Sequence, residues 1–182
     1  MTPKFYLDIK ANAIDSEIPA YAVLGKAVHV LHGAFSKSNH IGKFAICFPA
    51  SRQGTGKRTV GYVIRIFASS SIELLILLDS LKGHHLVRDY TTFNMPKEVP
   101  VDFSGTWSVW RRIRVQKKDG VNRGKTIIRA TSAIFVDMRS STGHSFPLRV
   151  LRDVGEKQGD EATPNSYGLA SSENLFSLPD II

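Results

Sequence analysis

Short runs of apolar and β-branched residues predict four strands in the first half of the chain. These runs cover residues 4–9, 40–48, 59–68 and 86–94. Residues 19–35 instead carry apolar side chains at helical spacing, and Pro19 suits the first turn of a helix. A second helix is predicted over 72–83, because serines 69–71 can cap its start and Gly83 can close its end.

The resulting order, β-α-β-β-α-β, is that of a ferredoxin-like domain, predicted here over residues 1–96. The segment from Pro96 to Ser104 is rich in proline and glycine and marks the predicted boundary. In residues 105–182, apolar and β-branched runs between polar loops predict further strands at 107–116, 127–139 and 146–154. The expected fold class is therefore α+β, with a ferredoxin-like N-terminal domain and a smaller, irregular α+β C-terminal domain.

Charge is concentrated in the second half of the chain. The net charge is +8, with 24 Lys or Arg against 16 Asp or Glu. Between Trp107 and Arg129 there are eight basic residues and one acid, whereas the chain from Asp153 onward carries six acids and one lysine. A basic stripe of this density predicts a polyanionic partner. Charge alone does not choose between RNA, DNA and an acidic protein.

Cysteine content and hydropathy bear on the compartment. The one cysteine, Cys47, lies in an apolar run, and a single thiol cannot form an internal disulfide. No window reaches the ~18 apolar residues that a membrane helix needs, and the N-terminus lacks the pattern of a secretory signal. We therefore expect a cytoplasmic protein without a membrane segment.

Histidines and small hydroxyl residues are the candidates for chemistry. His29 and His32 lie three apart on the first predicted helix, but no Asp or Glu accompanies them there, so we expect no metal site and no cofactor. The loop MRSSTGHSF (138–146) can offer hydroxyl and backbone donors to a phosphate, although for this loop taken alone a plain β-turn is the better explanation. Tyr167 precedes a glycine at another predicted turn.

Five segments, taken in order, resemble the repeat-specific endoribonucleases of type I-F CRISPR systems, the Cas6/Csy-type family that processes precursor CRISPR RNA. The segments are FYLDI (5–9), VLHGAF (30–35), IGKFAICFP (41–49), RSSTGHSFPLRV (139–150) and SYGLASSENLF (166–176). The resemblance spans nearly the whole chain. It implies a ferredoxin-like N-terminal domain and a C-terminal domain that grips RNA, which agrees with the elements predicted above.

The resemblance also implies a reaction and its residues. The ribose 2′-hydroxyl attacks the adjacent phosphate without a metal, leaving a 2′,3′-cyclic phosphate and a 5′-hydroxyl. His32 matches the histidine that acts as base, with His29 as the alternative, because a neutral imidazole suits a base near neutral pH. Tyr167 matches the tyrosine that orients this base. Ser140 and Ser141 match the serines that hold the 2′-hydroxyl and the scissile phosphate, with their two roles left open.

The segment WRRIRVQKK (110–118) resembles the family's R-V-Q element, which reads base pairs beside the cut in the major groove. By that match Arg114 reads a guanine and Gln116 an adenine, each through paired hydrogen bonds. The remaining expected RNA contacts are basic or polar side chains nearby: Arg111, Arg112, Lys117, Lys118, Arg123, Lys125, Arg129, Arg139 and Thr142.

The chain departs from the family where most members carry a long arginine-rich helix. The segment KKDGVNRGKTIIR (117–129) is short and broken by glycine. Since each lost phosphate contact weakens binding and lowers its salt dependence, we expect weaker binding of the isolated hairpin and more reliance on partner proteins.

Three hypotheses follow for the function. The leading one is an endoribonuclease that stays on the 3′ hairpin of the mature CRISPR RNA, as a subunit of a type I-F surveillance complex with other Cas proteins. The second is a non-catalytic hairpin-binding subunit of the same complex. The third is a ferredoxin-like domain that binds an acidic protein. Cleavage that is lost in His32→Ala separates the first two, and failure to bind any hairpin favours the third.

Overall fold

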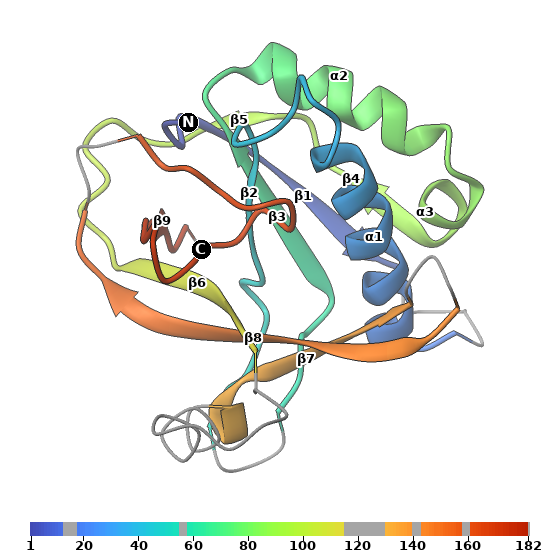
Figure 1. The fold of residues 1–182 in the computed structure, drawn as a ribbon. Helices are drawn as coiled ribbons and strands as arrows, with labels where there is room; N and C mark the ends of the chain where they lie inside the picture. The colour runs from blue at the N-terminus through green and yellow to red at the C-terminus, as the bar shows by residue number, and fades with distance from the viewer. Residues whose placement is uncertain (13–17, 55–57, 115–129, 140–142, 158–160, 182) are drawn as a thin grey trace.

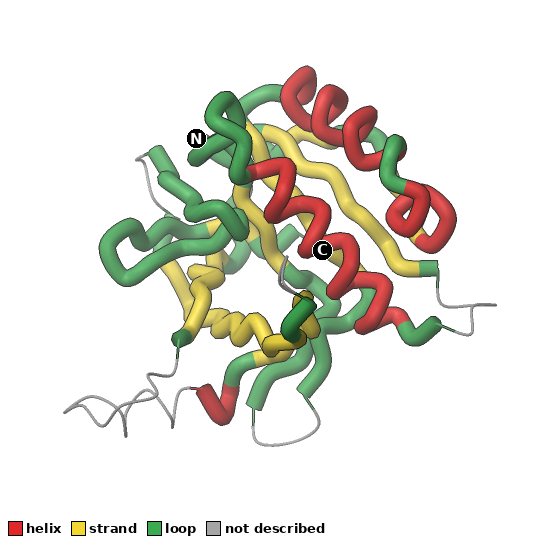
Figure 2. The backbone as a smooth tube through the Cα atoms, turned by 45° about the vertical axis from the view of Figure 1, so that its right-hand side comes forward, coloured by secondary structure: helices red, strands yellow, loops and turns green. Residues whose placement is uncertain are grey.

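Two antiparallel sheets, three helices and a short helical turn at 130–132 form the described part of the computed structural model, which comprises residues 1–12, 18–54, 58–114, 130–139, 143–157 and 161–181. Figure 1 shows their arrangement, and Figure 2 shows helices α1 (Ala20–Phe35) and α2 (Ser71–Lys82) on the same side of the first sheet. Within the described residues, no helix combines the length and the apolar character needed to cross a membrane.

The first sheet has the strand order of a ferredoxin-like fold, β2-β3-β1-β4, with β5 also pairing with β1. Its strands are β1 (Phe5–Ala11), β2 (Ala45–Cys47), β3 (Val63–Ala68), β4 (Thr91–Phe93) and β5 (Lys97–Glu98). Every pairing is antiparallel, and α1 and α2 each connect two strands that have a third strand between them. The predicted α+β class and the ferredoxin-like arrangement are confirmed.

One element of the first half was predicted wrongly. Residues 86–94 do not form a single strand, because His85–Tyr90 is a short helix, α3, and only Thr91–Phe93 pairs with β1. Val87 is the buried residue of α3, and the Thr91 hydroxyl donates to its carbonyl oxygen at 2.5 Å. Packing of the buried Val87 against the core in a helical turn is therefore stronger than the strand-forming composition of this segment.

The second sheet, of order β7-β8-β6-β9, is built entirely from the second half of the chain. Its strands are β6 (Trp107–Ile113), β7 (Ile134–Arg139), β8 (Ser145–Gly155) and β9 (Leu178–Pro179). The three predicted strands of this half are found, although the described residues of the second one, predicted over 127–139, are helical at 130–132 and form a strand from Ile134. The described residues of the second half thus combine strands with a short helical turn, as expected for a smaller α+β unit.

The two sheets meet in one continuous core, which includes Leu7 of β1, Leu31 of α1 and Leu148 of β8. Helix α1 lies so close to β7 that a Cβ at Gly25 would overlap the carbonyl oxygen of Asp137. The predicted division into units 1–96 and 105–182 remains a prediction.

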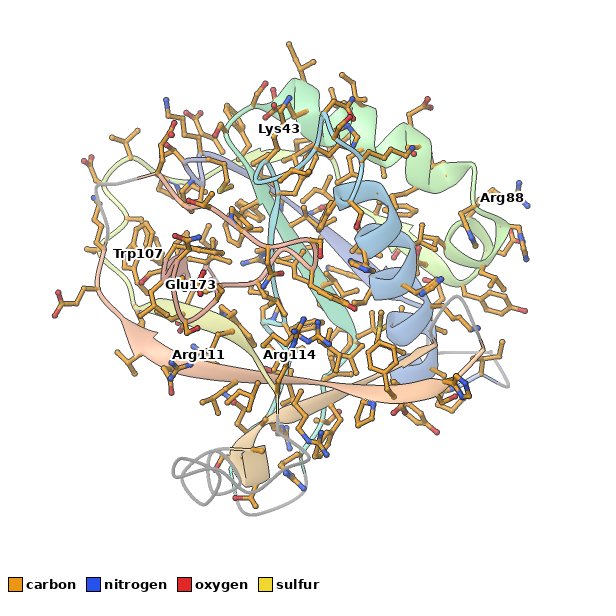
Figure 3. The ribbon with its side chains drawn as sticks, in the orientation of Figure 1. Lys43, Arg88, Trp107, Arg111, Arg114 and Glu173 are labelled. Atoms are coloured by element: carbon orange, nitrogen blue, oxygen red, sulfur yellow. The ribbon has the colours of Figure 1, made fainter. Side chains whose placement is uncertain are left out.

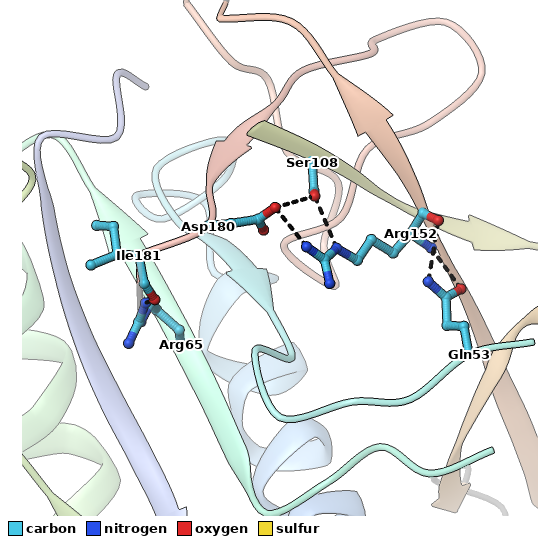
Figure 4. A network of polar contacts seen from close by, with 6 residues as sticks. All are labelled: Gln53, Arg65, Ser108, Arg152, Asp180 and Ile181. Carbon is cyan, nitrogen blue, oxygen red and sulfur yellow. Dashed lines mark hydrogen bonds and ion pairs between the residues drawn. The ribbon is translucent and has the colours of Figure 1, made fainter. Parts of the chain in front are cut away.

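A polar network also joins the halves (Figure 4). The Gln53 side chain exchanges two hydrogen bonds with the Arg152 backbone, at 3.2 and 2.9 Å. The Arg152 guanidinium donates to Ser108 Oγ at 2.9 Å and pairs with Asp180 at 2.6 Å. Arg65, from β3, donates to the carbonyl oxygen of Ile181 near the C-terminus. These contacts hold β6, β8 and the C-terminal residues against the first sheet.

Candidate active site

His32 and Tyr167 form a stacked pair of rings. His32 is half-buried in the last turns of α1, and Tyr167 lies in the C-terminal segment between β8 and β9. Their ring centroids are 3.9 Å apart and the ring planes differ by 3°. The structure therefore brings together two residues that lie in separate motifs, 135 positions apart in the sequence.

The carbonyl oxygen of Ser166 selects one tautomer of His32. It lies 2.8 Å from His32 Nδ1. A carbonyl oxygen can only accept a hydrogen bond, so Nδ1 must carry the hydrogen. In the neutral imidazole the lone pair is then on Nε2, which can accept a proton. The arrangement suits a histidine acting as a general base through Nε2.

A tight turn around Asn165 carries both partners of His32. Asn165 Oδ1 accepts from the backbone N–H of Tyr167 at 2.8 Å and of Leu169 at 3.3 Å. Gly168 has a φ of +72°, a conformation that favours glycine, and its N–H donates to the Asn165 carbonyl oxygen at 2.8 Å. The Gly168 carbonyl oxygen in turn accepts from Ile46 N at 2.8 Å, which attaches the turn to β2.

Arg112 covers the other face of the Tyr167 ring. Its Cζ atom is 4.6 Å from the ring centroid, and since His32 already stacks on one face, the guanidinium occupies the opposite one. Arg112 is half-buried. Burial lowers its pKa from the ordinary arginine value, and the charge of Arg114 acts in the same direction, whereas Tyr167 acts in the opposite one.

A cavity of about 560 Å³ adjoins this cluster. One wall is the end of β6, and the other is the C-terminal segment; the lining residues are Arg111–Arg114, Asn165–Tyr167 and Ala170–Glu173. Ala170 N donates to the Trp110 carbonyl oxygen at 2.8 Å, so the two walls are joined by the backbone. Figure 3 shows Arg111 and Arg114 along one wall and Glu173 on the other segment.

The pleat of β6 separates its neighbouring arginines. Trp110 and Arg112 pair with Arg152 and Val150 of β8, on the face that packs toward the core. Arg111 points to the opposite face, where it forms an ion pair with Asp153. Of these two arginines, Arg112 is therefore the one directed at the stacked rings.

Several predicted site residues lie outside the described part of the chain, and their placement stays a prediction. They are Ser140, Ser141, Thr142, Gln116, Lys117, Lys118, Arg123, Lys125 and Arg129. Arg139 is the last residue of β7, and its backbone pairs with Ser145. Asp137, close to the serine segment, contacts α1 at Gly25, which is about 10 Å before His32 along the helix.

The alternative base, His29, is exposed on α1. The stack with Tyr167 and the bond to Ser166 both belong to His32. Geometry thus favours His32 over His29. Among the described residues, no group of three or more His, Cys, Asp or Glu side chains is placed to hold a metal ion.

Two contributors to the site were not recognised in the sequence. Asn165 shapes the turn, and the Ser166 backbone binds His32. An asparagine three residues before a glycine is a usual turn signal, which could have identified Asn165. The role of the Ser166 carbonyl has no sequence signal, because any residue supplies one.

The fold and the site define a protein of the α+β class, in which a ferredoxin-like sheet is joined to a second sheet and a stacked histidine–tyrosine pair lies beside a cavity lined by arginines. The family model for CRISPR-associated protein (Cas_Csy4) matches residues 6–134, and the chain belongs to this family. The family comprises type I-F CRISPR endoribonucleases of the Cas6 type, so the resemblance stated from the five motifs is confirmed. The match supports a role in processing CRISPR repeat RNA. The search of curated proteins found no match.

Proposed function

We propose that the protein is a metal-independent endoribonuclease that cuts the CRISPR repeat hairpin of precursor RNA at the base of its stem. The observation that carries this proposal is the state of His32: Nδ1 is held by the Ser166 carbonyl oxygen, and the ring is stacked on Tyr167. A base with a defined tautomer and a restrained ring suits proton abstraction from a ribose hydroxyl. Tyr167 and Ser166 act as positioning residues for it.

The proposed reaction is a transesterification within the RNA. His32 Nε2 takes the proton of the 2′-hydroxyl while the 2′-oxygen forms a bond to phosphorus. The bond from phosphorus to the 5′-oxygen breaks, and this oxygen takes up a proton from water. The products are a 2′,3′-cyclic phosphate and a 5′-hydroxyl. The nucleophile belongs to the substrate, so the protein needs a base and groups that hold the phosphate, for which the family pattern nominates Ser140 and Ser141.

Recognition of the hairpin is proposed for the basic part of the chain. Arg114 and Gln116 would read base edges beside the cut. Arg111, Lys117, Lys118, Arg123, Lys125, Arg129, Arg139 and Thr142 would contact the backbone of the RNA. We also propose that the protein keeps the cut hairpin and remains with other Cas subunits in a type I-F surveillance complex.

The test is incubation of the purified chain with the hairpin repeat RNA in EDTA, with enzyme in excess. The expected result is one cut at the 3′ base of the stem, with a cyclic phosphate on the upstream product. His32→Ala should abolish the cut and retain hairpin binding, while His29→Ala, its match on the same helix, should still cut. Tight binding without any cut would favour the non-catalytic subunit, and a cut that survives His32→Ala would move the base to His29.

A further inference from the structure

Arg112 carries a charge that the described part of the chain does not neutralise. Arg65, Arg111 and Arg152 each pair with a carboxylate. Arg112 has no such partner among the described residues, although it is half-buried and its pKa is lowered by burial. Partial removal of a cation from water without a counter-charge is unfavourable. Such a group is suited to receive an anionic ligand.

This charge lies beside the proposed base and the tyrosine that positions it. Arg112 lies 4.6 Å from the centroid of the Tyr167 ring, and His32 lies 3.9 Å from it on the other face. The base and the guanidinium are thus separated by the thickness of one aromatic ring. A ribose-phosphate unit placed against the edge of Tyr167 can reach both groups. Arg114, by comparison, is exposed and follows the end of β6.

We propose that Arg112 is a catalytic residue that binds the scissile phosphate and stabilises the charge that builds up on its non-bridging oxygens during 2′-hydroxyl attack. This inference rests on the proposed ribonuclease function. A guanidinium suits the role because it stays charged and can donate two parallel hydrogen bonds to two phosphate oxygens. Its stack on Tyr167 holds the group in place before substrate binds, which is the condition for electrostatic stabilisation of a transition state.

The test compares Arg112→Met with wild type under single-turnover conditions at saturating hairpin RNA. The expected result is a rate loss on the order of 100-fold, with a much smaller change in the Kd for the hairpin. Arg149→Met is the matched control, because Arg149 also stacks on an aromatic ring, Phe135 at 5.6 Å, but lies on the other face of the second sheet. This control should cleave at the wild-type rate.

Two further measurements separate a catalytic role from a structural one. Sulfur substitution of a non-bridging oxygen at the scissile phosphate should slow wild type more than it slows Arg112→Met, since the variant has already lost the contact. Arg112→Lys, which keeps the charge without the planar stack, should recover part of the rate. If Arg112→Met cleaved at the wild-type rate, or if sulfur slowed both proteins equally, the inference would be overturned while the proposed ribonuclease function would stand. No cleavage by wild type would overturn both.

Discussion

The imidazole of His32 and the phenol ring of Tyr167 lie face to face, with centroids 3.9 Å apart and planes 3° apart. The two residues come from the first helix and the C-terminal segment, and the turn that presents Tyr167 also presents the Ser166 carbonyl oxygen to His32 Nδ1. One turn therefore controls both the position and the tautomer of the proposed base. Changes to this turn should affect the chemistry more than they affect RNA binding.

Asn165 provides the first test of that relationship. Asn165→Leu removes the acceptor of two backbone N–H groups, so the ring of Tyr167 and the Ser166 carbonyl should shift relative to His32. We expect the single-turnover cleavage rate to fall by roughly 10- to 100-fold, with little change in hairpin Kd. Asn165→Asp keeps the acceptor and should retain most of the rate.

Asn94→Leu is the matched control for that experiment. Asn94 Oδ1 accepts from the Asp8 backbone N–H at 2.6 Å, so the variant loses the same kind of bond in the first sheet. It should lower stability without lowering the cleavage rate. Equal rate losses in the two variants would show that Asn165 acts only through general stability.

The two glycines of α1 should respond in opposite ways to alanine. A Cβ at Gly25 would overlap the Asp137 carbonyl oxygen, whereas a Cβ at Gly33 would have nothing within 4 Å. Gly25→Ala should therefore lower the free energy of unfolding by about 1–3 kcal/mol, because the helix and β7 must separate. Gly33→Ala should raise it by up to about 1 kcal/mol through helix propensity. Urea unfolding of both variants measures this, and a Gly25→Ala protein as stable as Gly33→Ala would contradict the close approach.

Asp8 and Arg65 form a buried ion pair, with contacts of 2.7 and 3.0 Å. Arg65→Met should lower the free energy of unfolding by about 3–5 kcal/mol, because it leaves the Asp8 carboxylate buried without a counter-charge. The double variant with Asp8→Leu should recover part of this loss in denaturant unfolding. The exposed pair of Arg88 and Asp89 is the control, and Arg88→Met should change stability little. An Arg65→Met protein of wild-type stability would show that the pair is dispensable.

Cys47 should make stability depend on alkaline pH. Burial raises the pKa of its thiol well above the ordinary value of 9.0. The unfolded chain therefore loses this proton first as pH rises, so the thiol's contribution to the free energy of unfolding is complete below about pH 9 and declines above it. Because a single proton is involved, the free energy of unfolding can fall by at most about 1.4 kcal/mol per pH unit.

Comparison with Cys47→Ala isolates this effect, since lysines and tyrosines titrate in both proteins. The difference in unfolding free energy between wild type and Cys47→Ala should be constant from pH 7 to 8.5 and should shrink above pH 9. Parallel curves up to pH 10.5 would contradict the assignment.

Local patterns were sufficient for much of the framework. The apolar period of residues 19–35 corresponds to α1, and the runs at 4–9 and 59–68 contain most of β1 and all of β3. The segment 86–94 was misassigned, because its β-branched and aromatic residues favour a strand while tertiary packing uses Val87 in a helical turn. Strand propensity is a property of the isolated segment, so it cannot account for the packing of α3 against the core.

By itself, the sequence determined the family, the order of elements and the set of chemical groups, since motifs and hydrophobic periods are local properties. Only the tertiary structure decided which groups meet. The rotation of α1, held by Gly25 against β7, directs His32 rather than His29 at Tyr167. The pairing of β6 with β8 directs Arg112 inward and Arg111 outward. These choices depend on contacts between residues far apart in the chain, for which a local pattern carries no signal.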